Sequence, residues 1–369
     1  MFVSNNNQFK PIIISKNIRL KNILKIKNNF QLMSFSKFKS FLKTNNFKKI
    51  ELDFDYTNYE VYKSLKSFLT INQSHIDIDK YQSKKTLIEQ KNIYSCHIED
   101  GLALTKFIIQ LKTKKIIPKN EYSIFESLYN LRKEGINFFR NSFDYICAFD
   151  SNAAIVHYRP LPYISKKYKN QKLLLLDSGA HYLEGTTDVT RVIKICSPIK
   201  EKIKNFYTYL LKSLLRIENI KFSKNLLSSD IDNFIRSYLA KHQIYYGHGT
   251  GHGVGYFNDV HEKYPIISSN SHQKILNGNF FSIEPGFYVS NEFGLRIENL
   301  YFAIKSGNFF KLKNITLVPY ELDLINWNLI TSLEKSYIKR YHQKIFDIFK
   351  GQLNTEYKEY FKKKLINKI

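Results

Sequence analysis

The chain has 369 residues, of which 43% are apolar, and its 29 Phe and 26 Tyr exclude a largely disordered protein. At about 150 residues per domain, this length suits two domains rather than one. The formal charge of +25 would suit a nucleic-acid partner, but the lysines are dispersed and no arginine-rich run is present. We therefore interpret the charge as a general overuse of lysine and expect no nucleic acid as a partner.

Signals for export or membrane insertion are not visible in the sequence. Residues 1–10 lack the apolar stretch of a secretory signal, and no run approaches the roughly 20 apolar residues that span a bilayer. Cys96, Cys147 and Cys196 are too far apart for a metal or redox motif and form no disulfide framework. We therefore expect a cytoplasmic protein without a membrane partner.

The first 90 or so residues predict part of an α/β unit. Residues 50–54 have a strand pattern, and residues 58–69 have the pattern of an amphipathic helix. The number of strands is too low for a complete open sheet. A helix is then expected over residues 96–113 and another after Pro118, with either Ser123 or Asn120 at its N-terminal boundary.

From about residue 145 the pattern changes to short apolar strands, two helices and further strands. Strands followed by helices and then strands at hairpin spacing predict an α+β fold, with an antiparallel sheet covered by helices. The expected strands are 145–149, 173–176, 189–195, 248–255, 280–284 and 295–304, and the expected helices are 198–216, 229–242 and a basic region within 332–369.

Four carboxylates lie in unusual places in these strands. Asp177 ends an apolar strand, and Asp188 enters the next one, so a hairpin would bring the two together. Glu284 ends another apolar strand, and Glu298 lies in the strand that follows. Any one of them could be a rim residue or pair with a basic side chain. Together they predict a pair of divalent cations, because like-charged carboxylates otherwise repel one another.

A glycine-rich segment, residues 247–255, adds a nitrogen ligand. Its five glycines exclude a stable helix, so His248 and His252 are not the helical ligand pair of a zincin. Oxygen-rich ligation with one imidazole favours Mn²⁺, with Co²⁺, Fe²⁺ or Zn²⁺ as alternatives. Two such ions about 3.5–4 Å apart bridge a water and polarise a carbonyl, which is the chemistry of amide or ester hydrolysis.

Short motifs surround these positions. They are DSGAHY at 177–182, GTTDVTR at 185–191, GHGTGHGVG at 247–255, VHE at 260–262, SIEPG at 282–286, LRIEN at 295–299, ITLVP at 315–319 and WNLI at 327–330. With these motifs the chain closely resembles Xaa-Pro aminopeptidase (aminopeptidase P) of metallopeptidase family M24, from about residue 98 to the C-terminus. The tail resembles the extra region of the long, three-domain type.

The resemblance implies a pita-bread catalytic domain over residues 91–310, a partial N-terminal α/β domain over residues 1–90 and a helical C-terminal extension over residues 311–369. It also implies two manganese ions, with Asp188 bound to both. The other implied ligands are Asp177, His252, Glu284 and Glu298.

The implied reaction releases an N-terminal residue that precedes proline. Glu284 would be the general base, and Arg296 would hold an acidic ligand in place. His261 would hydrogen-bond the substrate or intermediate as a catalytic residue, His157 would share its role, and both would line the substrate pocket with His248. Peptides with proline at the second position are the expected partners, and a homodimer is a further expectation.

The sequence departs from the family pattern in three places. Lys263 and Tyr264 stand before Pro265, where Gly-Pro is usual, and His181 replaces a commoner Gln. Residues 1–90 resemble only the later part of the second of two N-terminal domains. This predicts an N-terminally shortened enzyme or a misassigned start, and it leaves a catalytically impaired peptide-binding protein as an alternative. Prolidase-like dipeptidase and methionine aminopeptidase are the rival enzymes of the same fold.

Overall fold

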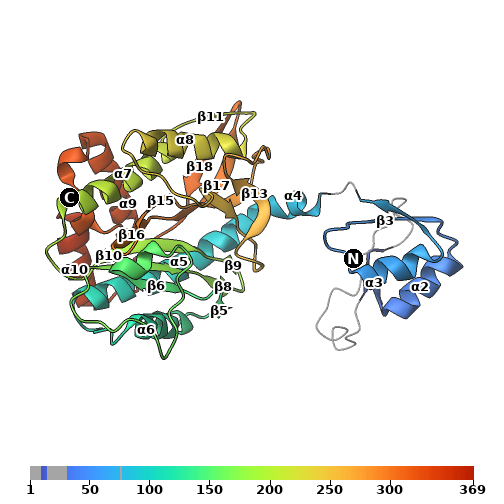
Figure 1. Ribbon diagram of the computed structural model, residues 1–369, viewed down its shortest axis with the longest axis horizontal. Helices are drawn as coiled ribbons and strands as arrows, with labels where there is room; N and C mark the ends of the chain where they lie inside the picture. The colour runs from blue at the N-terminus through green and yellow to red at the C-terminus, as the bar shows by residue number, and fades with distance from the viewer. Residues whose placement is uncertain (1–9, 15–30, 75–76) are drawn as a thin grey trace. The chain divides into compact units, whose positions relative to one another are not determined.

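The computed structural model describes residues 10–14, 31–74 and 77–369. The chain divides into two compact units, one ending at Ile78 and the other spanning Asp79–Ile369 (Figure 1). The sequence analysis expected three domains with boundaries near residues 90 and 310. Those domain boundaries differ from the division at Ile78 and stay a prediction.

The N-terminal unit contains two pairs of parallel strands and two helices. Strand β1 (Ile12–Ile14) pairs with β2 (Gln31–Met33), and β3 (Lys49–Leu52) pairs with β4 (Thr70–Gln73). Helix α2 spans Phe35–Thr44, and α3 spans Tyr59–Lys66. The strand and helix expected at 50–54 and 58–69 are confirmed, and both end earlier than expected.

The larger unit begins with three helices. They are α4 (Ile78–Ser83), α5 (Leu87–Lys112) and α6 (Glu121–Lys133). The expected start of α5 near residue 96 is wrong, because Thr86 and Glu89 form a capping box that begins the helix nine residues earlier. The sequence pattern hides this start, because the first turn exposes Leu87 and Ile88 to solvent. Asn120 is the N-cap of α6, and Ser123 completes its capping box.

A three-stranded antiparallel sheet forms the centre of the first half of this unit. Strand β7 (Leu173–Ser178) lies between β10 (Val189–Lys194) and β6 (Ile146–Phe149). Leu173 and Leu175 belong to a hydrophobic core shared with helix α7 (Glu201–Glu218), and Leu174 and Leu176 belong to a second core shared with α5 and α6. Alternate side chains of a strand point to opposite faces. Because β7 is buried on both faces, its sequence is an unbroken run of leucines rather than an alternation of apolar and polar residues.

A six-stranded antiparallel sheet forms the second half. Its order is β11-β18-β17-β14-β12-β13. The expectation of one strand over residues 295–304 is wrong, because the chain breaks at Ile297 and Glu298. Strand β16 (Phe293–Arg296) pairs with β15 (Gly286–Val289) before the break. Strand β17 (Asn299–Ser306) pairs with β14 (Phe280–Ile283) after it. The bounds are β11 (Phe222–Ser223), β12 (Gly251–Gly253), β13 (Glu262–Ile267), β14 (Phe280–Ile283), β15 (Gly286–Val289), β16 (Phe293–Arg296), β17 (Asn299–Ser306) and β18 (Phe309–Asn314).

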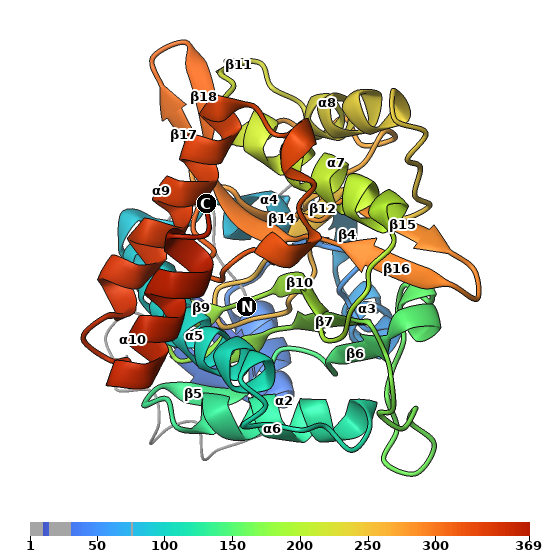
Figure 2. The same cartoon turned by 90° about the vertical axis from the view of Figure 1, so that its left-hand side faces the viewer.

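Helices cover the strands from two sides. In Figure 2, α7 (Glu201–Glu218) and α8 (Ser228–Ala240) lie on one side of the strands, and α5 and α6 lie on the other. Helix α9 (Ser332–Phe349), α10 (Thr355–Phe361) and the π-helical turn η4 (Lys362–Ile366) form the C-terminal region. The expected α+β fold of antiparallel sheets covered by helices is confirmed. The remaining elements are β5 (Phe138–Asn141), β8 (Ala180–Tyr182), β9 (Gly185–Thr186), η1 (Asp150–Ala154), η2 (Leu322–Leu324) and η3 (Trp327–Leu329).

Candidate metal centre

The five residues expected as metal ligands come from strands or strand ends of both sheets. Strands β7 and β10 pair in a register that sets Thr190 opposite Asp177, so Asp188 enters beside the end of β7. Strands β14 and β17 pair with Ile283 opposite Asn299, so Glu284 and Glu298 also leave neighbouring strands at one point. The register therefore brings the members of each acidic pair to neighbouring strand ends, as their spacing in the sequence indicated.

His252 lies among the acidic side chains. Ligand atoms of Asp188, His252 and Glu298 all lie within 4.8 Å of one another. The His252 Nε2 atom is 3.6 Å from Asp188 Oδ2 and 3.4 Å from Glu284 Oε1. His252 Nδ1 donates its proton to the Gly253 carbonyl at 2.9 Å, which leaves the Nε2 lone pair directed toward the carboxylates. This is the tautomer that a metal-binding imidazole requires.

Arg296 holds two of the carboxylates. Its Nη2 atom donates to Asp177 Oδ2 at 2.6 Å, and its Nε atom lies 3.9 Å from Glu284 Oε2. Thr190 Oγ1 donates to Glu298 Oε2 at 2.8 Å. The structure therefore places Arg296 beside acidic ligand candidates, as the sequence analysis expected.

Three carboxylate oxygens in this cluster are buried and lack a hydrogen-bond partner among the described residues. They are Asp177 Oδ1, Asp188 Oδ1 and Glu298 Oε1. An unpaired polar atom in a protein interior costs about 1–3 kcal/mol, and more when it is charged. Coordinated cations satisfy such oxygens, so these residues fit a metal centre.

The cluster also disfavours its own ionisation when metal is absent. Burial, followed by the neighbouring Glu298 and Asp177, raises the pKa of Asp188 well above its ordinary value. Burial and the neighbouring Glu284 do the same to the pKa of Glu298. Burial raises the pKa of Glu284 to about 7 in spite of Arg296. A divalent cation supplies the positive charge that would let all four carboxylates ionise together.

A cavity of about 310 Å³ contains this cluster and is also lined by three further histidines, His157, His248 and His261. The His261 ring lies 4.1 Å from the ring of His252. Burial lowers the pKa of His248 to about 4 and also lowers the pKa of His261, so both imidazoles are neutral near pH 7. Phe143, Ile146 and Val156 supply an apolar part of the wall.

Tyr288 contacts both Arg296 and His248, and the sequence analysis missed it. Its hydroxyl accepts a hydrogen bond from Arg296 Nη1 at 2.9 Å and lies 2.9 Å from His248 Nε2. His248 Nδ1 donates a hydrogen bond to the Gly249 carbonyl, so Nε2 carries no hydrogen and accepts a hydrogen bond from the Tyr288 hydroxyl. The hydroxyl occupies space that Gly286 leaves open, since a Cβ at that position would stand 2.4 Å from it. Hydrogen bonds therefore link Asp177 through Arg296 and Tyr288 to His248.

Two glycines of the 247–255 segment, Gly251 and Gly253, have a steric reason. A Cβ at Gly251 would stand 1.9 Å from the Ser282 carbonyl oxygen, and a Cβ at Gly253 would stand 2.3 Å from the Tyr264 carbonyl oxygen. Strand β12 therefore fits between β13 and β14 only because it carries no side chains at these positions. This close fit carries His252 into the cluster.

Comparison with known proteins agrees with this geometry. The model of metallopeptidase family M24 matches residues 92–304, and the model of the C-terminal region of peptidase M24 matches residues 308–365. The chain belongs to metallopeptidase family M24. Among M24 relatives, a putative Xaa-Pro aminopeptidase of Saccharomyces cerevisiae is 38% identical over 283 residues, which are 74% of this chain and 37% of that protein. Xaa-Pro aminopeptidase 1 of Dictyostelium discoideum is 36% identical over 276 residues, 71% of this chain and 44% of that protein.

The chain thus spans less than half the length of these curated M24 relatives. A solved structure of X-prolyl aminopeptidase from Caenorhabditis elegans, described as a cytosolic enzyme with a di-nuclear active site, matches a larger share of this chain. That structure is similar with a TM-score of 0.80 and 27% identity, over 94% of this chain and 59% of that one. Prolidase from Pyrococcus furiosus shares the fold, with a TM-score of 0.67 at 21% identity. The expected pita-bread fold is confirmed.

His181, one of the departures from the family pattern, is not among the described residues that line the metal-site cavity. Its Nδ1 atom lies 3.0 Å from Thr186 Oγ1, and its ring meets the edge of Phe257. His181 thus contacts a neighbouring strand and loop rather than the ligand cluster. Among the described residues of this M24 protein, no helix combines the length and apolarity needed to cross a bilayer.

Proposed function

We propose that this M24 protein is a metal-dependent aminopeptidase that hydrolyses the bond between an N-terminal residue and a following proline. The observation that carries the proposal is the cluster of ligand atoms from Asp188, His252 and Glu298. In this cluster Asp188 Oδ1 and Glu298 Oε1 are buried and have no hydrogen-bond partner among the described residues. The named relatives and the di-nuclear site of the similar Caenorhabditis elegans structure support the same activity.

Five residues would hold two divalent ions in this proposal, with Asp188 between them. The ions would be manganese, because oxygen ligands dominate and a single imidazole completes the set. Cobalt, iron and zinc are the alternatives. Bound metal would supply a water of lowered pKa and polarise the substrate carbonyl. The ligands would be Asp177, Asp188, His252, Glu284 and Glu298.

Glu284 would be the general base. Its Oε1 atom faces the cluster and lies 3.4 Å from His252 Nε2, where an ionised carboxylate could accept a proton from the attacking water. A proton taken at Glu284 from the attacking water would then pass to the leaving proline nitrogen. That nitrogen carries no hydrogen of its own before the bond breaks. Arg296 would keep Glu284 and Asp177 oriented.

Two histidines have donors to offer a substrate. Among the described residues, neither His157 nor His261 has a recorded hydrogen bond, although both line the cavity. Either imidazole could donate to the carbonyl oxygen of the scissile bond and stabilise its developing charge. His248 would act differently, since both of its nitrogens already have partners. It would shape the pocket and hold Tyr288.

The experiment is metal analysis combined with hydrolysis of an Xaa-Pro-Xaa peptide. We expect the wild type to hold metal after manganese supplementation and to cleave the peptide. Asp188→Ala should lose metal and reduce cleavage by about a thousandfold or more. Asp347→Ala, which removes an exposed carboxylate on α9, is the matched control and should behave as wild type. A wild type that binds no metal and cleaves nothing would sink the proposal.

The same assay separates the alternatives. Cleavage restricted to Xaa-Pro dipeptides would favour a prolidase-like dipeptidase. Peptide binding without cleavage would favour a catalytically impaired peptide-binding protein. We also propose a cytoplasmic location, supported by the cytosolic description of the similar structure, and a homodimer. Light scattering on the purified protein tests the dimer.

A further inference from the structure

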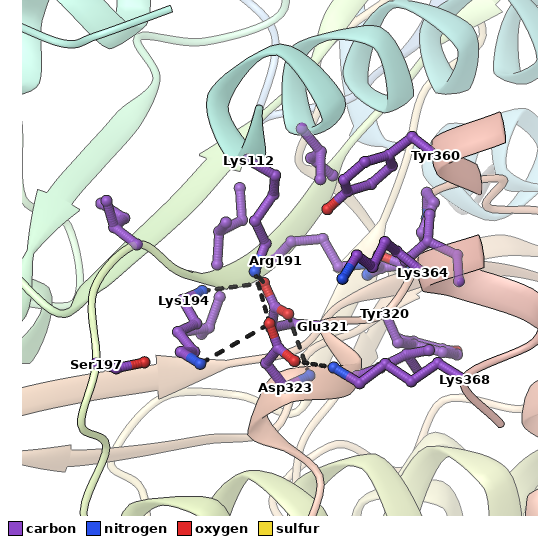
Figure 3. Close-up of a pocket in the computed structure, with 17 residues that line it drawn as sticks. Lys112, Arg191, Lys194, Ser197, Tyr320, Glu321, Asp323, Tyr360, Lys364 and Lys368 are labelled. Atoms are coloured by element: carbon purple, nitrogen blue, oxygen red, sulfur yellow. Dashed lines mark hydrogen bonds and ion pairs between the residues drawn. The ribbon is translucent and has the colours of Figure 1, made fainter. Parts of the chain in front are cut away.

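A second cavity of about 310 Å³ lies in the larger unit, outside the metal centre. Its walls come from the end of α5, from β10 and from the C-terminal region (Figure 3). Four lysines and two carboxylates give it its chemistry. They are Lys112, Lys194, Lys364, Lys368, Glu321 and Asp323.

Both carboxylates in this pocket are already satisfied. Lys112 Nζ lies 2.6 Å from Glu321 Oε2, and the Lys194 backbone N–H donates to the same oxygen at 3.0 Å. The Asp323 backbone N–H donates to Glu321 Oε1 at 3.2 Å. Asp323 pairs with Lys368 and, at 3.3 Å, with Lys112. Although partial burial opposes it, the ammonium groups of Lys368 and Lys112 lower the pKa of the Asp323 carboxyl to about 2.

Positive charge and donors are left over. Lys112, Lys194 and Lys368 share the two carboxylates, with Lys194 Nζ 3.9 Å from Asp323 Oδ2. The exposed Lys364 has no ion pair with any described residue. The Tyr360 hydroxyl likewise has no recorded hydrogen bond within the described part of the chain. Figure 3 shows the Lys364 amino group and the Tyr360 hydroxyl pointing from the C-terminal segment toward Lys112 and Glu321. Burial and the nearby Glu321 raise the pKa of Tyr360, so its hydroxyl keeps a proton to donate.

The available cations indicate an anionic ligand. Arg191 also lines the pocket, but its guanidinium already donates hydrogen bonds to the Val318 and Glu298 carbonyls. It is therefore not available to bind a carboxylate through two parallel hydrogen bonds. Lysine ammonium groups are compact point charges that bind phosphate oxygens from several directions. The volume lies at the lower end of the roughly 300–1,000 Å³ typical of ligand pockets, which suits a small molecule.

We propose that this pocket is a binding site for a small phosphate-bearing anion. Lys364, Lys368 and Tyr360 hold it from the C-terminal segment, and Lys112 and Lys194 face it from the opposite wall. The anion joins the C-terminal region to β10 and completes the charge balance of the pocket. This site is separate from the metal centre and does not depend on the proposed aminopeptidase activity.

Calorimetric titration of the full chain with glucose 6-phosphate at constant ionic strength tests the proposal. Glucose and glucuronate are the comparison ligands. Glucose carries no charged group, and glucuronate carries a carboxylate in place of the phosphate. We expect saturable binding of glucose 6-phosphate alone, weakened about tenfold by Lys364→Ala. Tyr360→Phe keeps the ring and should weaken binding less. Lys363→Ala removes a neighbouring lysine that does not line the pocket, and it should bind as wild type.

Further outcomes decide against the site. Glucuronate binding as tight as glucose 6-phosphate, or equal weakening by Lys363→Ala and Lys364→Ala, would show attraction to general positive charge. Undiminished binding by a folded Lys364→Ala would also overturn the proposal. Asp188→Ala should retain full affinity, and a loss of binding in that variant would place the phosphate at the metal centre instead. Circular dichroism checks that each variant is folded.

Discussion

The two pockets of the larger unit have the same volume, about 310 Å³, and opposite chemistry. In the metal centre, three buried carboxylate oxygens have no partner among the described residues, and a neutral imidazole faces the group. In the second pocket, both carboxylates are paired and a lysine is left without an acid. Each pocket contains acids and bases, so composition alone does not separate them. The groups left unpaired indicate the charge of the missing ligand.

Metal removal should have the largest effect on stability and acts on the first pocket alone. A ligand that binds one site of the folded chain stabilises it by about 4 kcal/mol at a free concentration about a thousand times Kd. We therefore expect urea unfolding in excess manganese to require a clearly higher midpoint than unfolding in a chelator. Asp188→Ala should remove most of this difference. Equal midpoints with and without metal in the wild type would contradict a metal centre.

The pH dependence of the metal-free protein should be the next largest effect. Burial raises the pKa of Glu284 from 4.5 to about 7, so the folded chain keeps a proton that the unfolded chain has lost. The folded state then binds more protons between about pH 4.5 and 7, and this contribution to stability is lost as pH rises through that window. It is on the order of 3 kcal/mol for such a shift.

The difference in unfolding free energy between wild type and Glu284→Gln isolates this group from the histidines. We expect the unfolding free energy of the wild type, relative to that of Glu284→Gln and measured in chelator, to be lower at pH 8 than at pH 4.5. A pH-independent difference would mean that Glu284 ionises normally in the folded protein.

Breaking an ion pair in the second pocket should have a smaller effect. Lys112→Met keeps the aliphatic bulk of the side chain but removes the ammonium from the buried Glu321 carboxylate. Because two backbone N–H groups still bind that carboxylate, we expect a loss of about 1–2 kcal/mol in denaturant unfolding. Lys350→Ala breaks an exposed pair with Asp347 and should change nothing measurable. Equal losses from both variants would show that burial does not set the strength of these pairs.

Much of the metal centre could be predicted from the sequence because its acids interrupt apolar strands. An unbroken leucine run that ends in Asp177 is a visible anomaly, and the spacing to Asp188 gives the strand pairing. The Tyr288 to His248 contact could not be predicted in the same way. It depends on the β15–β16 hairpin, which was hidden when residues 295–304 were interpreted as one strand.

The second pocket was invisible for a different reason. Dispersed lysines were interpreted as general overuse, since no basic run was present. Folding brings Lys112, Lys194 and Lys364 together from three segments that are far apart in the chain. Sequence patterns report neighbours along one helix or strand, so a charge cluster assembled from three segments leaves no local signal. The start of α5 was missed because its exposed first turn has no apolar periodicity.

Arg191 has a consequence for how the protein can be divided. Its buried guanidinium donates to the Glu298 carbonyl at 2.7 Å, to the Val318 carbonyl at 2.9 Å and to the Tyr341 hydroxyl at 3.2 Å. Two family models meet between residues 304 and 308, yet this one side chain ties both parts to the strand that follows Asp188. A truncation at that junction would leave the buried Arg191 guanidinium without its Val318 and Tyr341 partners, next to the candidate metal centre. The C-terminal region therefore supports the residues around this centre, and shortened chains are unsuitable for measuring its metal affinity.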